Sequence, residues 1–188
     1  VFMKKMIIVL VITCILSAFV LSISYTKFIN KINYNQQKAL EDAIKIVLPT
    51  ASKFEKLNSN ELSIYKGLND NNEIIGYAIY MVGGGYQDNI YILVSISSDL
   101  KNIINIYILD QKETPGLGAR IQEDNFKNQF SGLSTEKEIT YVKNAKASKE
   151  NNQIEAISGA TISSKSVVKI LNSNLKKAIE IINKTKEN

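Results

Sequence analysis

The sequence SGATISSKSVVKILNSNLKKAIEII, residues 158–182, joins a short turn of small and hydroxyl-bearing residues to a long amphipathic run. In the run, apolar residues recur every three or four positions, which is the spacing of one helix face, and lysines fill many of the other positions. The apolar face comprises Val167, Val168, Leu171, Leu175, Ala178, Ile179 and Ile182. The pattern predicts a helix that starts near Thr161 and packs this face against a core.

The start of this helix, Ser158-Gly159-Ala160-Thr161, has two interpretations. Serine and threonine are common N-caps, and a cap requires no ligand. Alternatively, the unpaired N–H groups and the positive dipole end of a helix attract phosphate, and the Thr161 hydroxyl could carry one. Gly159 and Ala160 leave room for a bulky group. Lys165 is either a charge partner of the phosphate or part of a solvated face.

The middle of the chain has the pattern of β-strands. Two segments flank the turn-forming Asn69-Asp70-Asn71-Asn72 and predict a hairpin, and two more follow. The four segments are Leu62–Gly67, Ile74–Val82, Ile90–Ser97 and Asn102–Leu109. This strand block before a terminal helix predicts an α+β domain, with an antiparallel meander covered on one face. Ahead of it, Asn35–Leu48 has the pattern of a short helix that Pro49 ends.

Two glycine-containing connections follow strands of this block. Gly83-Gly84-Gly85 is either a flexible turn or a place where the backbone approaches a flat ligand. The second connection is Glu113-Thr114-Pro115-Gly116-Leu117-Gly118, in which proline presets one backbone angle and the glycines permit positive φ. Such a turn can present Leu117 to the face of a ring and Glu113 and Thr114 to its edge.

The N-terminal region predicts a membrane anchor. Met6–Ile23 is an uncharged stretch of 18 residues, and as a helix it spans roughly 27 Å, close to the thickness of the hydrocarbon core. A signal peptide cleaved near Ser22-Ile23-Ser24 is the alternative, although the run exceeds the usual h-region. The short basic N-terminus favours an extracytoplasmic domain. We expect a cytoplasmic N-terminus (1–5), a transmembrane anchor (6–25), a linker and helix (26–60) and the main domain (61–188).

The composition excludes several classes of chemistry. The chain has 188 residues, no histidine and a single cysteine, Cys14. Ser-His-Asp catalysis, His-ligated zinc or haem, intrachain disulfides and Fe–S clusters are therefore excluded. Redox chemistry would require an organic cofactor. The net charge of +5 comes from lysines, with Arg120 as the single arginine, which argues against nucleic-acid binding.

The two motifs together, ETPGLG at 113–118 and SGAT at 158–161, resemble the FMN-binding domain family. Within it, the chain is most similar to the G subunit of the Rnf-type electron-transport complex, a relative of the C subunit of the sodium-pumping NADH:quinone reductase. The resemblance implies that Thr161 carries FMN through a phosphoester bond, which a dedicated FMN transferase installs from FAD. It also implies cofactor contacts by Ser158, Gly159, Ala160, Ser163, Ser164, Glu113, Thr114, Gly116, Leu117 and Gly118.

Two positions depart from the family pattern. Glu155 stands where an aspartate is usual, and Gln111-Lys112 stand where a histidine often lies near the ETPGLG turn. Glu155 keeps the carboxylate with one more methylene, so this change concerns recognition by the transferase. The absence of a histidine near the ETPGLG turn affects only the contacts that are expected with the flavin ring.

The function implied by the resemblance is electron relay through covalent FMN in a membrane complex. In that complex, electron flow between reduced ferredoxin and NAD is coupled to ion movement, and the other membrane subunits supply the substrate sites and the ion path. Two alternatives use the same domain, a component like the C subunit of the quinone reductase and a standalone extracellular electron-transfer protein. A cofactor-free scaffold and a receptor-like domain that binds free FMN are alternatives from other classes.

Overall fold

The computed structural model describes residues 2–57, 59 and 61–187. Its first element, α1 (Phe2–Val47), is one helix of 46 residues. The prediction of a separate short helix over Asn35–Leu48 is therefore wrong, because that segment continues the preceding helix without a break. No proline or glycine occurs before Pro49, so nothing in the local sequence ends the helix earlier.

The first part of α1 has the length and composition of a membrane-crossing helix. Its most apolar window of 18 residues has a mean hydropathy of 3.0, and none of that window is buried. The hydroxyls of Thr13 and Ser17 each donate a 2.8 Å hydrogen bond to a backbone carbonyl one turn back. These two polar side chains are thus satisfied within the helix, as an apolar surrounding requires.

The chain divides into two compact units, of which the second starts at Asp42. This folded unit begins ahead of the expected boundary at residue 61, because the last turn of α1 is part of it. Ala43, Ile44, Val47 and Leu48 are each at most 2% exposed. The Ser95 hydroxyl, in the middle of the sheet, donates a 2.7 Å hydrogen bond to the Val47 carbonyl. The end of α1 therefore covers part of one sheet face.

The sheet of the folded unit is an antiparallel meander in chain order. Its strands are β1 (Lys53–Lys56), β2 (Ile64–Leu68), β3 (Ile74–Gly84), β4 (Asn89–Ser97) and β5 (Ile103–Asp110). The predicted hairpin is confirmed, with Ile79 opposite Ile64 and the turn closed by the Asn69 carboxamide. The strand β1 was not predicted, since its sequence KFEK is charged and too short to show alternation.

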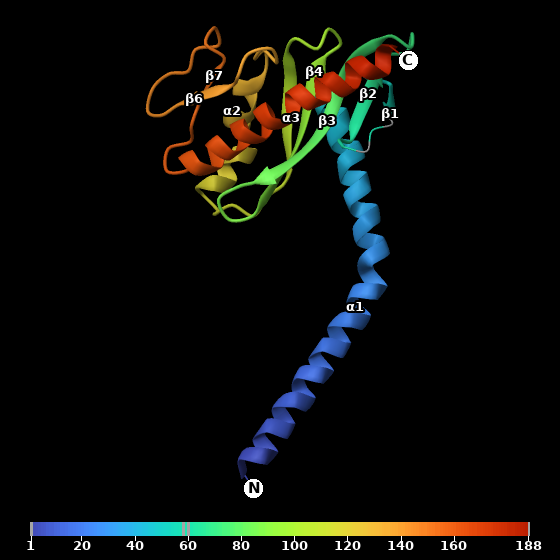
Figure 1. Ribbon diagram of the computed structural model, residues 1–188, viewed down its shortest axis with the longest axis vertical. Coiled ribbons are helices and arrows are strands. Elements are labelled where there is room, and N and C mark those ends of the chain that lie inside the picture. The colour runs from blue at the N-terminus through green and yellow to red at the C-terminus, as the bar shows by residue number, and fades with distance from the viewer. Residues whose placement is uncertain (1, 58, 60, 188) are drawn as a thin grey trace. The chain divides into compact units, whose positions relative to one another are not determined.

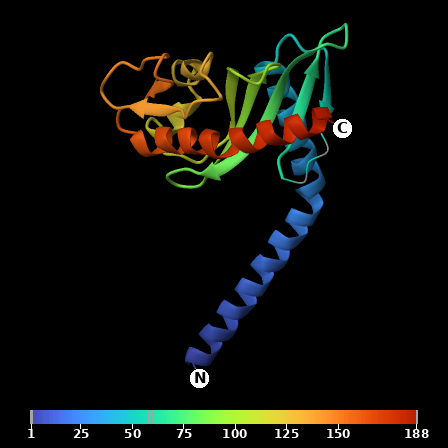
Figure 2. The same ribbon diagram turned by 45° about the horizontal axis from the view of Figure 1, so that its top comes forward.

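The C-terminal helix α3 (Thr161–Glu187) crosses the other face of the sheet. In both ribbon views it runs from the side of β6 and β7 toward β1 and β2 (Figure 1, Figure 2). The predicted apolar face packs on the sheet, where Val167 and Leu171 are fully buried with Ile79, Met81 and Ile92. The predicted α+β class, with its antiparallel sheet and C-terminal helix, is thus confirmed.

The three consecutive glycines are not simply a turn. Gly83 and Gly84 belong to β3 and pair with Ile90 and Asn89, and only Gly85 lies in the connection. A Cβ on Gly83 would lie 2.5 Å from Cγ1 of Ile170 in α3. The absent side chain therefore allows the first half of α3 to approach the backbone of β3 closely.

A second lobe lies beyond β5 and was not predicted from the sequence. It contains the short helices η1 (Gly118–Gln122), α2 (Asp124–Lys127) and η2 (Asn128–Phe130). It also contains a parallel pair, β6 (Thr140–Val142) and β7 (Gln153–Glu155). The pair matters for the site because β6 leads into Lys143 and β7 leads into the SGAT turn (Figure 1).

Candidate functional site

The SGAT turn opens α3 without a side-chain cap. The residue before the helix is Ala160, whose carbonyl accepts the Ser164 N–H at 3.1 Å and whose side chain has no acceptor. Gly159 has a φ of 80°, a left-handed conformation that glycine adopts readily. Among the described residues, the half-buried Thr161 hydroxyl has no hydrogen-bond partner. The N-cap interpretation therefore does not account for Thr161.

The other two hydroxyls of the first turn are directed into the protein. The Ser164 hydroxyl is fully buried, accepts the Ile157 N–H at 3.0 Å and donates to the Ala160 carbonyl at 3.1 Å. Ser163 is 3% exposed, and its hydroxyl donates to the Glu113 carboxylate. Both hydroxyls therefore support the start of α3, and the cofactor contacts expected of these two serines stay predictions.

Glu113 also faces inward. It is only 4% exposed, and its carboxylate oxygen Oε1 accepts the backbone N–H groups of Tyr86 and Gln87 at 2.8 and 3.1 Å. Its second oxygen accepts the Ser163 hydroxyl. One carboxylate thus joins the β3–β4 connection, the ETPGLG loop and the first turn of α3.

Further polar contacts fix the ETPGLG loop to the β3–β4 connection. The Gln87 carboxamide donates to the Thr114 hydroxyl at 3.0 Å, and Lys112 Nζ lies 2.9 Å from Asp88 Oδ2. The hydrogen bond from Lys112 lowers the pKa of the Asp88 carboxyl, and the same contact raises the pKa of Lys112. Both charged groups are exposed, so this pair positions the loops more than it stabilises the fold.

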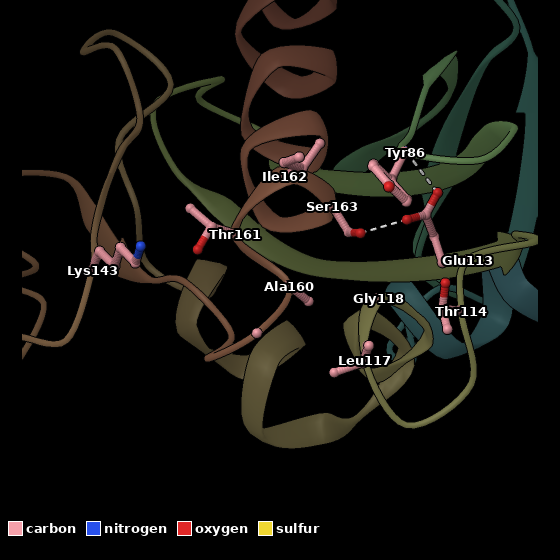
Figure 3. A pocket seen from close by; sticks show the side chains of 11 residues that line it. Tyr86, Glu113, Thr114, Leu117, Gly118, Lys143, Ala160, Thr161, Ile162 and Ser163 are labelled. Atoms are coloured by element: carbon pink, nitrogen blue, oxygen red, sulfur yellow. Dashed lines mark hydrogen bonds between the residues drawn. The ribbon is translucent and has the colours of Figure 1, made fainter.

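The three motif segments enclose a cavity of about 420 Å³. It is lined by Tyr86, Glu113, Thr114, Leu117, Gly118, Lys143, Gly159, Ala160, Thr161, Ile162 and Ser163. Thr161 and Lys143 lie toward one end of it, whereas Tyr86 and Glu113 lie toward the other (Figure 3). The cavity thus has a hydroxyl and a cation toward one end and an aromatic ring and a carboxylate toward the other.

Three large apolar side chains remain exposed around this cavity. Tyr86, Leu117 and Ile162 are 63%, 46% and 55% exposed, although each lines it. They come from the β3–β4 connection, the ETPGLG loop and the first turn of α3. Apolar side chains that line an open cavity are typical of a site for a ligand with a flat apolar part.

Most of the predicted site residues are brought together, and three are not. Ser158 lines a separate cavity of about 570 Å³ with Glu155, and Ser164 is enclosed by the helix start. Gly116 shapes its loop through a φ of 75° and does not line the cavity. Lys165 is exposed and lines a third cavity, not the one that Thr161 lines. Its exposure is consistent with a solvated helix face.

Sequence reasoning missed Tyr86, Lys143 and Ile162. Tyr86 directly follows the glycine run, and Ile162 is an apolar residue off the core face of α3, so both carried a signal. Lys143 carried none, because its place depends on the parallel pairing of β6 with β7, which brings Val142 opposite Glu155. The carboxylate of Glu155 accepts the Ala147 N–H at 3.1 Å and helps to hold the intervening loop.

The chain is similar to known proteins over the region that contains this site. The model of the FMN-binding domain matches residues 85–176, a range that contains both motifs and the whole cavity. The chain is 33% identical over 177 residues to the G subunit of the ion-translocating oxidoreductase complex of Methanosarcina acetivorans, covering 90% of each chain. It is 32% identical over 173 residues to the G subunit of the proton-translocating ferredoxin:NAD(+) oxidoreductase complex of Clostridium ljungdahlii, covering 91% of this chain and 86% of that one.

A solved structure is also similar. The C subunit of the Na(+)-translocating NADH-quinone reductase of Parabacteroides distasonis superposes with a TM-score of 0.56 at 28% identity. The match covers 64% of this chain and 62% of that chain, so less than two thirds of that solved structure is represented. The two G subunits, in contrast, align over almost their full length. The chain therefore belongs to the FMN-binding domain family, and within it to the G subunits of ion-translocating oxidoreductase complexes.

Proposed function

We propose that this protein is a membrane-anchored electron-transfer flavoprotein in which the Thr161 hydroxyl carries FMN through a phosphoester bond. The observation that carries the proposal is the position of that hydroxyl. It lies unpaired among the described residues, at the start of α3, in a cavity within the region that matches the FMN-binding domain.

The end of the cavity with Thr161 suits a phosphate. The first N–H groups of a helix have no intrahelical acceptor, and the dipole makes that end positive. Lys143 adds a positive charge on the same cavity wall. Gly159 and the small side chain of Ala160 leave space for the chain that links a phosphate to a ring.

The rest of the cavity suits an isoalloxazine ring. The exposed side chains of Tyr86, Leu117 and Ile162 would be covered by the ring, which removes apolar surface from water. FMN supplies one- and two-electron transfer when bound, and the chain itself binds and orients it. No further catalytic group is needed for a relay.

Attachment of FMN requires a transferase that uses FAD. The Thr161 oxygen attacks the phosphorus of the FMN half of FAD, and the pyrophosphate bond breaks. AMP leaves, and the hydroxyl proton is lost to a base. Because the Thr161 hydroxyl is half-buried at the cavity wall, the reaction needs no unfolding of α3. We place the folded unit, and hence this reaction, on the extracytoplasmic side on the basis of Lys4 and Lys5, which precede the apolar run within α1.

The partners in this proposal are the other membrane subunits of an ion-translocating ferredoxin:NAD oxidoreductase complex. They would supply the ferredoxin and NAD sites and the ion path. The alternative, a role like that of the C subunit of the quinone reductase, is less favoured. Its solved relative is matched over 62% of its length, whereas the two G subunits are matched over 90% and 86%.

The test is covalent loading in cells that also express an FMN transferase. Intact mass spectrometry of the full chain should show an added FMN less one water, and a denaturing gel should fluoresce under ultraviolet light. Thr161→Ala should abolish both signals, whereas Ser173→Ala, which removes an exposed hydroxyl further along α3, should retain them. Only unmodified polypeptide in the wild type, or label that survives Thr161→Ala, contradicts the proposal.

A further inference from the structure

Glu113 joins three segments that are far apart in the sequence. Its carboxylate accepts the N–H groups of Tyr86 and Gln87, 27 and 26 residues away, and the hydroxyl of Ser163, 50 residues away. Those segments supply Tyr86, Leu117 and Ile162, the exposed apolar side chains of the cavity. No backbone hydrogen bond outside the regular elements connects the described parts of the β3–β4 connection and α3.

Two glycines make room for this carboxylate. A Cβ on Gly85 would lie less than 3.0 Å from Glu113 Oε1, and one on Gly118 would lie 2.7 Å from Oε2. Neither glycine has a positive φ, so backbone conformation does not require glycine at these positions. At Gly118 a side chain would meet the Glu113 carboxylate and the Ser163 hydroxyl, and at Gly85 it would meet the Glu113 carboxylate and, at 2.7 Å, the Asp88 carbonyl.

The carboxylate is buried without a cation. No lysine or arginine among the described residues forms an ion pair with Glu113, and Lys112, its neighbour in sequence, is paired with Asp88. Three donors and the positive end of α3 offset its charge instead. A negative charge beside a flavin disfavours the addition of an electron, and the effect is strong where water is excluded.

We infer that Glu113 is a positioning residue with two effects, which rest on the proposed flavin site. Its hydrogen bonds preform the cavity by clasping the β3–β4 connection and the ETPGLG loop to the first turn of α3. Its charge holds the reduction potential of the flavin down. Glu113 thus acts through Tyr86, Gln87 and Ser163 rather than as a ligand of the ring edge, which was its expected role.

Two substitutions separate the effect of the hydrogen bonds of Glu113, called the clasp from here on, from the effect of its charge. Glu113→Gln removes the charge but can keep every hydrogen bond, because the amide oxygen accepts the two N–H groups and the amide nitrogen donates to the Ser163 hydroxyl. Glu113→Ala removes both. Glu136→Gln is the matched control, since it removes the same charge from an exposed side chain away from the cavity.

The clasp is measured without flavin, by hydrogen exchange of the Tyr86 and Gln87 amides in the full chain in detergent micelles. Glu113→Ala should accelerate their exchange by about tenfold or more, because both amides lose their acceptor. Glu113→Gln and Glu136→Gln should remain within about threefold of wild type. Unchanged exchange in Glu113→Ala overturns the clasp.

The charge is measured on the flavin-loaded full chain by reductive titration. Glu113→Gln should shift the midpoint potential in the positive direction, and Glu136→Gln should leave it unchanged. Equal potentials in Glu113→Gln and Glu136→Gln overturn the charge effect. If the wild type takes up no flavin, the proposed function and the charge effect both fail, while the amide measurement still decides the clasp.

Discussion

The start of α3 and the loops around it have a closed side of buried residues and an open side of exposed or half-buried residues, and the two sides use their polar groups differently. On the closed side, Glu113, Ser163 and Ser164 are at most 4% exposed, and their oxygens bond to other parts of the protein. On the open side, Thr161 has an unpaired hydroxyl among the described residues, and Leu117 and Lys143 line the cavity. Residues of one motif are thus divided between those bonded inside the protein and those whose side chains remain open to the cavity.

Residues that are close together in one motif can therefore have different roles. Thr161, Ser163 and Ser164 lie within a single turn of α3, yet only Thr161 is left without a partner among the described residues. Substitutions on the closed side should therefore change the stability of the folded unit. Substitutions on the open side should change flavin loading and leave the empty protein intact.

The largest effect is expected on the closed side, at Gly118. A Cβ there would lie 2.5 Å from Ser163 Oγ and 2.7 Å from Glu113 Oε2, so Gly118→Ala should lower the free energy of unfolding by about 1–3 kcal/mol. Gly84→Ala is the matched control, because its Cβ would meet nothing within 4 Å. Thermal unfolding of both variants checks this. Equal free energies of unfolding in the two variants would show that the neighbouring side chains can move to make room for a Cβ at position 118.

A slightly smaller effect is expected at Ser164. Ser164→Ala leaves the partly buried Ile157 N–H without its acceptor, and this should cost about 1–2 kcal/mol of stability. Ser173→Ala is the control, since that hydroxyl is exposed and bonds only to the carbonyl of Lys169 one turn back. Denaturant unfolding measures the difference. If Ser164→Ala destabilises the protein no more than Ser173→Ala does, the Ser164 hydroxyl does not support the folded unit.

On the open side, Lys143→Gln should slow FMN loading by about twofold to fivefold, because an exposed charge interacts weakly with a phosphate. Lys165→Gln should load at the wild-type rate, since Lys165 lies by another cavity. The rate of mass increase during incubation with transferase and FAD gives both values. If Lys165→Gln loads FMN more slowly and Lys143→Gln loads it at the wild-type rate, Lys165 and not Lys143 is the cation that assists loading.

The smallest effect on the empty protein is expected at Leu117. Its side chain is 46% exposed, so Leu117→Ala should change the stability of the unloaded chain by no more than about 0.5 kcal/mol. The loaded variant should lose part of the thermal stabilisation that the flavin confers, because the ring loses an apolar contact. Melting temperatures with and without flavin test this. A large loss in the unloaded chain would place Leu117 in the supporting structure.

Several features of this protein could be predicted from local sequence patterns. The helical spacing after SGAT located α3, and the alternating segments around Asn69–Asn72 located the β2–β3 hairpin. Eight of the predicted site residues line the cavity. They belong to two short motifs that are each continuous in the sequence, so they could be identified before the fold was known. Periodicity and turn chemistry depend on neighbours in the chain, so these features are visible in a single sequence.

Other features were decided by the tertiary structure alone. The inward direction of Glu113 depends on Ser163, 50 residues away, and the place of Lys143 depends on the pairing of β6 with β7. Local sequence patterns are sufficient to show which groups are present and which elements hold them. Only the folded chain decided which of those groups are bonded inside and which remain open to a ligand, because hydrogen bonding and burial are set by contacts between distant segments.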